Sequence, residues 1–264
     1  MLIICNGVFK SGSTWLHAII LEMLACKKID VSKVSSKYTN NIKSPTTIIE
    51  SRFRSFILNE DYHNKHYINK SHFYMDKTFE YKYTEDVIFV FSEREIKDSI
   101  VSHFFHIKHK YLRSINFKLY YWLIGRFKAY EIISFNDLYK KKFSKEFFFN
   151  YYDLKNNFND TIFRIANILR LDSFNDNELD VIKSKTSLSE MRKNILNGES
   201  YYYSTVLNDR HKLIRKGEIG DHINFFSKYM LKDIDKIQNK KVSYIFRAIY
   251  YITFTFRRKT FDIE

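Results

Sequence analysis

Apolar and polar residues follow one another in blocks that predict a repeated order of strand, turn and helix. Short apolar runs begin at Ile3, Tyr67, Val87 and Phe147. Continuous runs of this kind are typical of strands that are buried on both faces of a parallel sheet. Several of them are followed by apolar residues at spacings of three and four, which predict helices over residues 16–24, 96–107 and 162–169.

This order predicts an α/β fold, a three-layer sandwich with a mostly parallel central sheet of about five strands. A short helix is expected behind Pro45, and a pair of helices within residues 110–146. The chain shows no internal repeat and no linker rich in Gly, Pro or Ser. We therefore expect a single domain over residues 1–264, with a basic and aromatic tail over about 240–264.

The charge balance indicates an anionic partner. The chain has 264 residues, a formal net charge of +14 and 45% hydrophobic residues. Such a surplus suits a nucleotide, a nucleic acid, an acidic glycan or a membrane surface. Cys5 and Cys26 have no spaced partners, which predicts reduced packing residues and a cytoplasmic location. We see no secretory signal and no run of 18 apolar residues.

The turn after the first strand carries the clearest chemistry. Gly7 and Gly12 bound it, and the next helix begins directly behind it. Main-chain amides in such a turn, at the positive end of a helix, suit an anion. In a triphosphate-binding loop the lysine follows the second glycine, whereas here Lys10 lies inside the turn. This position brings a cation close to the first phosphate and to whatever group leaves from it.

The segment from Phe9 to Leu16 resembles the Y-P-K-S-G-T-T-W-L signature of sulfotransferases. Those enzymes take a sulfonate group from 3'-phosphoadenosine 5'-phosphosulfate (PAPS) and release 3'-phosphoadenosine 5'-phosphate (PAP). The resemblance implies a P-loop-like nucleotide site, with Trp15 stacked near the adenine. It assigns the 5'-phosphosulfate to Lys10, Ser11, Gly12, Ser13, Thr14 and Trp15.

Lys70-Ser71-His72, at the end of a short strand, resembles the K-[TS]-H motif of the same family. An acceptor hydroxyl is a poor nucleophile until a base removes its proton, and imidazole titrates near neutral pH. The carboxyl end of a strand is also where open α/β sheets bind ligands. The resemblance implies that His72 is the catalytic base, that Lys10 stabilises the leaving group and that Lys70 contacts the sulfonyl oxygens.

Two further segments resemble family motifs for the 3'-phosphate of the donor. Arg94 and Ser102 match the ends of R-N-P-K-D-x-x-x-S, and eight helical residues would place them within about 80 degrees of one face. A later segment, which begins with Arg215, Lys216 and Gly217, matches the motif R-K-G-x-x-G-D-W at every specified position except the tryptophan. The planar guanidinium of arginine, the ammonium of lysine and a hydroxyl group can all donate hydrogen bonds to a phosphate dianion.

Two weaker matches concern the adenine. Tyr151 takes the tyrosine position of a Y-E-D-[LM] motif, and Thr186 opens a match to T-S-F-x-x-M-x-x-N. The resemblance implies that both residues contact the adenine side of the donor. The matched motifs run from residue 7 to residue 222 in the order of the family, and they imply no metal.

The identity of the acceptor is the part of the function that the sequence indicates least clearly. The basic surface, the aromatic tail and the lack of a small-molecule segment before the first strand favour a glycan or glycolipid hydroxyl. The alternative is a small phenol or alcohol. We expect no nucleic acid partner, and the tail either packs on the sheet or contacts the inner membrane surface.

Two other functions compete with this interpretation. A kinase with a related phosphate loop would bind ATP and need magnesium, but the G-K-[ST] ending is missing. A basic module that binds nucleic acid or acidic lipid would explain the charge but not the ordered motifs.

Overall fold

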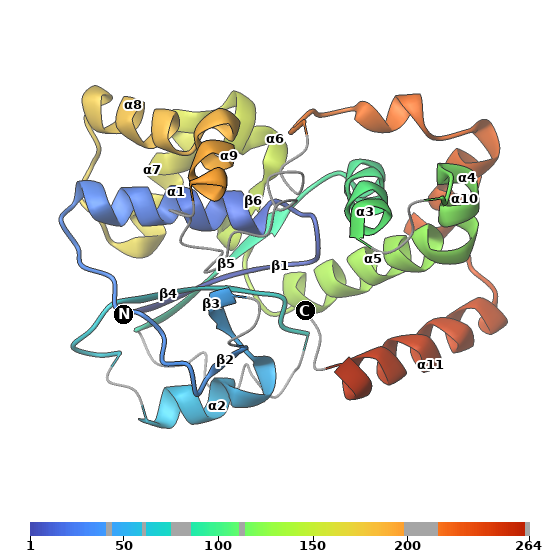
Figure 1. Cartoon of the computed structure of the whole chain (residues 1–264), viewed down its shortest axis with the longest axis horizontal. Helices are drawn as coiled ribbons and strands as arrows, with labels where there is room; N and C mark the ends of the chain where they lie inside the picture. The colour runs from blue at the N-terminus through green and yellow to red at the C-terminus, as the bar shows by residue number, and fades with distance from the viewer. Residues whose placement is uncertain (41–43, 60–61, 75–85, 111–113, 198–215, 262–264) are drawn as a thin grey trace. The chain divides into compact units, whose positions relative to one another are not determined.

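The chain builds a parallel sheet whose strands are joined by helices. A computed structural model describes all residues except 41–43, 60–61, 75–85, 111–113, 198–215 and 262–264. In the described part, the sheet has four strands in the order β4-β1-β5-β6, and all neighbours are parallel (Figure 1). The strands are β1 (Leu2–Gly7), β4 (Tyr67–Ser71), β5 (Val87–Glu93) and β6 (Phe148–Asn150). This confirms the predicted α/β class.

The register of the sheet brings the ends of its strands to one edge. Asn6 lies opposite Ser71 in β4, and Gly7 lies opposite Ser92 in β5. Glu93 lies opposite Asn150, the last residue of β6. The segments that follow all four strands therefore start at the same edge, which is where open α/β sheets bind ligands.

The chain divides by contacts into two units. Unit 1 comprises residues 1–94 and 143–217, and unit 2 comprises residues 95–142 and 218–264. The single-domain organisation that the sequence predicts stays a prediction.

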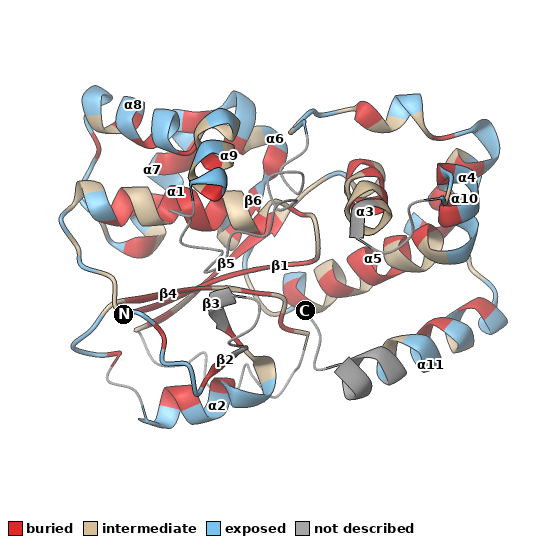
Figure 2. Ribbon diagram, viewed as in Figure 1, coloured by how far each residue is buried: buried red, intermediate tan, exposed pale blue. Residues whose placement is uncertain are grey.

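Unit 1 holds the four-stranded sheet between two layers. One face is covered by α1 (Ser13–Cys26) and by α6 to α9, and the opposite side carries α2 and the β2-β3 ribbon (Figure 1). The core between sheet and helices is apolar, and β1 is buried along its whole length (Figure 2). The other elements are α2 (Glu50–Asn59), α6 (Tyr151–Asn156), α7 (Phe158–Leu169), α8 (Asp176–Lys185), α9 (Leu188–Leu196), η3 (Lys145–Phe147), β2 (Thr39–Asn40) and β3 (Ser44–Ile48).

Unit 2 is helical. The helix pair predicted within residues 110–146 is wrong, because one helical run covers residues 117–140 and passes through a π-helical turn. Gly125, at the end of that turn, keeps helical angles and is buried, so it does not break the run. The elements are α3 (Ile96–Lys110), α4 (Phe117–Tyr120), η2 (Tyr121–Gly125), α5 (Arg126–Lys140), η5 (Asp221–Asn224), α10 (Lys228–Gln238) and α11 (Tyr244–Phe261).

The aromatic tail forms α11, which packs on α5 within unit 2. Phe246 stacks on Phe127 with ring centroids 4.7 Å apart, and Tyr250 lies edge-on to Tyr130 at 4.8 Å. In the described residues we find no helix whose length and hydropathy together would carry it across a bilayer.

Both cysteines are free, as the sequence predicts. Cys5 is buried in β1, and burial raises the pKa of its thiol far above the ordinary value. Cys26 is half-buried at the end of α1. A buried thiol with a raised pKa is a packing residue and not a nucleophile.

Candidate active site

The turn between β1 and α1 has the geometry of an anion-binding loop. Gly12 adopts a φ of 101°, in the left-handed region, and no side chain caps the helix that begins at Ser13. Lys10 also has a positive φ, of 59°, which turns the chain sharply within the loop. The amides of the first turn of α1 thus lie at the positive end of a helix, where they suit a phosphate group.

Two serines hold this loop against the neighbouring strand. The hydroxyl oxygens of Ser11 and Ser92 lie 2.6 Å apart, and both residues are buried. A Cβ on Gly7 would lie 2.3 Å from the Ser92 oxygen, so only glycine fits between them. Ser92 was not predicted as a site residue, because a serine at the end of an apolar strand carries no signal until the register is known.

Tyr151 lies at the centre of the predicted donor site. A Cβ on Gly12 would come within 2.8 Å of its ring, and the ring of Trp15 lies 5.1 Å away, centroid to centroid. The guanidinium of Arg94 lies over the Tyr151 ring at 4.4 Å. Side chains that follow β1, β5 and β6 therefore meet at one point.

The other side of Tyr151 contacts Gly217. The Tyr151 hydroxyl donates to the Gly217 carbonyl oxygen at 3.3 Å, and the Lys155 ammonium donates to the same oxygen at 2.8 Å. Gly217 has a φ of 63°, and a Cβ on it would meet Leu188 at 2.4 Å. Lys155 was not predicted, because it lies outside the matched letters of the motif.

Thr186 lies on the Trp15 side of the cluster. The Trp15 indole donates to the Thr186 carbonyl oxygen at 2.9 Å, while the buried Thr186 hydroxyl donates to Ile182 at 2.8 Å. Ser187 caps α9, as expected for a serine in front of a helix.

His72 follows β4 and turns toward β1. Its Nδ1 makes a hydrogen bond with the Gly7 carbonyl oxygen, which can only accept. Nδ1 therefore carries the proton, and the imidazole lone pair is on Nε2, which is the tautomer that a general base needs.

Asn6 fixes the backbone next to His72. Its side-chain oxygen accepts from the Phe73 amide at 2.9 Å, and its side-chain nitrogen donates to the Phe73 carbonyl at 3.3 Å. Asn6 is fully buried and also accepts from Ser71 at 3.3 Å. Sequence reasoning missed this residue, although an asparagine in an otherwise apolar strand is a usable signal.

Replacing Asn6 by alanine would leave the buried Phe73 amide without its acceptor. We expect Asn6→Ala to lower the free energy of unfolding by about 1–3 kcal/mol and to lower kcat, because the segment around His72 loses its anchor. Asn69→Ala is the matched control, since Asn69 accepts from the Ile48 amide at 2.7 Å in the same sheet. Urea unfolding and initial rates would test this. Equal kcat in the two variants would contradict a positioning role for Asn6.

Lys70, the predicted sulfonyl contact, lies half-buried in β4 opposite Cys5. Its neighbour is His17 in α1, which is fully buried and makes a hydrogen bond with the Ile68 backbone. Burial, with a smaller contribution from the Lys70 charge, lowers the pKa of His17 to about 3. His17 is therefore neutral in the folded protein at neutral pH.

This shift predicts a pH dependence of stability. In the unfolded chain His17 takes a proton as pH falls below about 6.5, whereas the folded chain resists this down to about 3. The stability that depends on neutral His17 is present above pH 6.5 and is lost as pH falls from there. Urea unfolding between pH 7 and 5 should show a steeper decline in wild type than in His17→Gln. Parallel declines would contradict this assignment.

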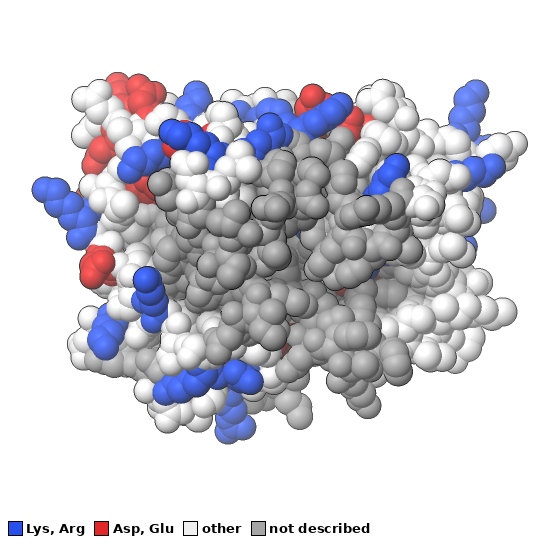
Figure 3. Space-filling view, viewed as in Figure 1, with Lys and Arg blue, Asp and Glu red and all other residues white. Residues whose placement is uncertain are grey.

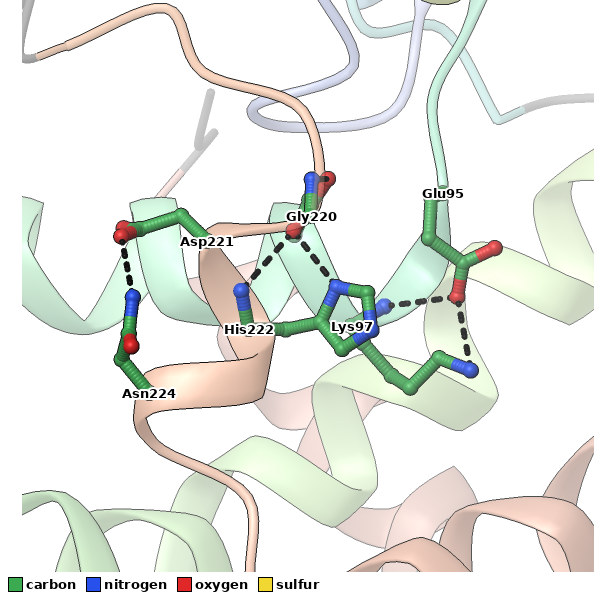
Figure 4. A network of polar contacts seen from close by, with 7 residues as sticks. Glu95, Lys97, Gly220, Asp221, His222 and Asn224 are labelled. Atoms are coloured by element: carbon green, nitrogen blue, oxygen red, sulfur yellow. Dashed lines mark hydrogen bonds and ion pairs between the residues drawn. The ribbon is translucent and has the colours of Figure 1, made fainter.

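In unit 2, Asp98 binds the segment that follows Gly217. Its carboxylate accepts from the Gly220 amide at 2.8 Å, from the His222 amide at 3.1 Å and from His222 Nδ1 at 2.7 Å. Figure 4 labels the two partner residues, Gly220 and His222. Asp98 is only 2% exposed. Ser102 lies one helical turn further along α3, on the same face. The end of the R-K-G-x-x-G-D segment is thus fastened to the helix that carries Ser102.

Removing this carboxylate should weaken donor binding. We expect Asp98→Ala to raise the Kd for PAP by at least about tenfold, because two half-buried amides lose a charged acceptor and the segment is released from α3. Glu95→Ala is the control, since Glu95 is exposed and its carboxylate accepts from the amide and pairs with the ammonium of Lys97, two residues further along (Figure 4). Calorimetry with PAP measures both. An unchanged Kd in Asp98→Ala would refute this role.

The other predicted contacts of the 3'-phosphate differ in exposure. Lys216 is exposed, and Arg215 lies outside the described residues. Ser102 is half-buried in α3. Because α3 begins at Ile96, the calculation that put Arg94 and Ser102 on one helical face is wrong for Arg94, which precedes the helix.

The parallel sheet, the amide-rich turn at its carboxyl edge and the aromatic and cationic cluster beside it define a nucleotide-binding α/β protein. Residues 2–246 match the sulfotransferase domain family, and the chain belongs to this family. It is a PAPS-dependent sulfotransferase, an enzyme that transfers a sulfonate group and releases PAP.

Solved structures share the fold at low sequence identity. Mouse sulfotransferase SULT7A1 complexed with PAP is 20% identical, with 94% of this chain and 87% of that chain covered and a TM-score of 0.66. Retinol dehydratase with androsterone and inactive cofactor PAP is 16% identical over 90% of this chain and 79% of that chain, at a TM-score of 0.61. Its complex with retinol and PAP is 15% identical over 90% and 80%, at 0.59. A search of curated proteins finds no match.

Proposed function

We propose that this sulfotransferase moves the sulfonate group of PAPS to the hydroxyl of a small acceptor molecule, with His72 as general base. The observation that carries the proposal is the convergence on Tyr151 of Gly12, Trp15, Arg94 and Gly217. These residues belong to motifs that lie far apart in the sequence. A fold unrelated to that of sulfotransferases would not be expected to bring them into contact. The proposal treats residues 1–264 as one working domain.

The reaction is an in-line displacement at sulfur. His72 Nε2 takes the proton from the acceptor hydroxyl, and the oxygen forms a bond to sulfur as the bond from sulfur to the 5'-phosphate oxygen breaks. PAP leaves with that electron pair. Lys10 stabilises the charge that develops on the leaving oxygen, and Lys70 contacts the sulfonyl oxygens.

The remaining cluster residues bind the donor. Trp15, Tyr151 and Thr186 lie together and form the adenine side. The loop from Ser11 to Thr14 holds the 5'-phosphosulfate through its amides and hydroxyls. The 3'-phosphate contacts are Arg94, Ser102, Arg215, Lys216 and Gly217.

The chemical class of the acceptor is a more specific part of the proposal. Retinol dehydratase has been solved with androsterone and with retinol, which are small molecules that carry a hydroxyl. This favours the small alcohol over the glycan or glycolipid that the sequence favoured. Incubation of PAPS labelled at sulfur with a panel of small alcohols, phenols and oligosaccharides would identify the acceptor. Transfer to oligosaccharides alone would overturn this choice.

Thermal unfolding with nucleotides tests the donor assignment. PAP at a hundred times its Kd should stabilise the folded protein by about 2.7 kcal/mol, whereas ATP with magnesium should have a much smaller effect. Sulfonate transfer should also persist in EDTA. Stabilisation by ATP with magnesium but not by PAP would favour the kinase alternative.

A further inference from the structure

The exposed face of α11 is apolar over the described part of the helix. Tyr244, Ile245 and Ile252 are 78%, 70% and 70% exposed, and Ile249 is 45% exposed. At 100 degrees per residue, these side chains and Ala248 fall within about 140 degrees of the helix circumference. Over residues 244–255, whose side chains the structure describes, no charged residue falls in this sector. Figure 3 shows more Lys and Arg than Asp and Glu on the face of the molecule that is turned to the viewer.

The opposite face of α11 holds the helix in place. Phe246 and Tyr250 pack on α5, and the Arg126 guanidinium lies 4.9 Å from the Phe246 ring centroid. Phe246 and Tyr250 are 7% and 4% exposed. The isoleucines are therefore presented by a packed helix, so a partner can bind them without any unfolding.

The charges around this face indicate which kind of partner would bind it. Residues 240–261 contain no Asp or Glu. Lys240 pairs with Asp137 of α5 at 2.5 Å, and the other basic residues of this stretch are Lys241, Arg247, Arg257, Arg258 and Lys259. Lys241 and Arg247 are exposed beside the apolar face. A second copy of the chain would bring these like charges together, whereas an anionic lipid surface would neutralise them.

We propose that α11 binds the surface of an anionic membrane, with Tyr244, Ile245, Ile249 and Ile252 among the acyl chains and with Lys241 and Arg247 at the headgroups. An apolar helix face flanked by Lys and Arg, on a helix that does not span, is typical of interfacial binding. The proposal is independent of the sulfotransferase chemistry.

Co-sedimentation with vesicles tests the proposal on the full chain. Wild type should bind vesicles of phosphatidylcholine with phosphatidylglycerol, bind phosphatidylcholine alone at least about tenfold more weakly, and lose binding in high salt. The triple variant Ile245→Ser, Ile249→Ser, Ile252→Ser should lower the partition coefficient by at least about tenfold, because its side chains no longer enter the lipid. Lys241→Gln with Arg247→Gln should lower binding only to the anionic vesicles.

The matched control changes the same number of exposed apolar residues elsewhere, at Leu58, Val181 and Leu196, each to Ser. It should bind vesicles as wild type does, and circular dichroism should show all variants folded. Failure of wild type to bind anionic vesicles, or equal binding by the isoleucine variant, would overturn the proposal. A wild-type dimer in sedimentation velocity that the isoleucine variant abolishes, without vesicle binding, would instead assign this face to self-association.

Discussion

His72→Ala should lower kcat by at least about a hundredfold while the Kd for PAP stays within about twofold of wild type. The imidazole removes the acceptor proton in the proposed reaction, and its Nδ1 is held by the Gly7 carbonyl so that Nε2 can act as the base. It makes no proposed contact with the nucleotide, so donor affinity should survive. Initial rates with the acceptor found in the labelled-donor screen, together with calorimetry with PAP, measure the two effects separately.

His63→Ala is the matched control for this variant. His63 is an exposed histidine of the same unit, and it pairs with Asp86 at 2.5 Å. Its removal should leave kcat and the Kd for PAP unchanged. Near-full turnover in His72→Ala would remove that residue from the role of base, and a large rise in the Kd for PAP would place it in donor binding instead.

Features that depend on a few consecutive residues could be predicted from the sequence. The spacing of Gly7 and Gly12 predicted a tight turn, and the structure gives Gly12 a φ of 101° that only glycine adopts readily. Apolar runs predicted the four strands, because buried parallel strands need no polar alternation.

Features that depend on register could not be predicted in this way. Asn6 and Ser92 act through partners 67 and 81 residues away, at Phe73 and Ser11. Nothing in the local sequence says that these partners lie opposite until β1 is paired with β4 and β5. The helical face calculated for Arg94 and Ser102 was wrong for a related reason, since a helix start can shift by two residues without changing the apolar pattern.

The hydrogen bonds of Asp98 with Gly220 and His222 could not be predicted from the sequence either. The aspartate and the G-x-x-G-D segment are both visible as motif letters, but their contact is not, because the two lie more than a hundred residues apart. The substitution of His222 for the usual tryptophan keeps a side-chain donor at this position, and Nδ1 lies 2.7 Å from the Asp98 carboxylate. A change that looks disruptive in the letters therefore retains a hydrogen bond in the structure.

Lys10→Ala should also lower kcat by at least about a hundredfold, for a different physical reason. A fixed cation aimed at the leaving oxygen stabilises charge that exists only in the transition state, and one such donor is worth about 3–4 kcal/mol. The Kd for PAP should rise by less than about tenfold, since several amides and cations share the bound phosphates. Lys10→Arg should recover part of the rate. It restores a positive charge, but on a planar guanidinium whose geometry differs from that of the lysine ammonium.

The backbone at Lys10 makes the choice of control important. Its φ of 59° is unfavourable for any residue with a Cβ, so a loss of activity could come from the loop conformation and not from the charge. Lys28→Ala removes this doubt, since Lys28 has a φ of 55° at the end of α1 and lies at the other end of that helix from the loop. Both alanine variants should unfold at the same urea concentration to within error, and only Lys10→Ala should lose turnover. Equal turnover in the two variants would show that the Lys10 charge is not used in catalysis.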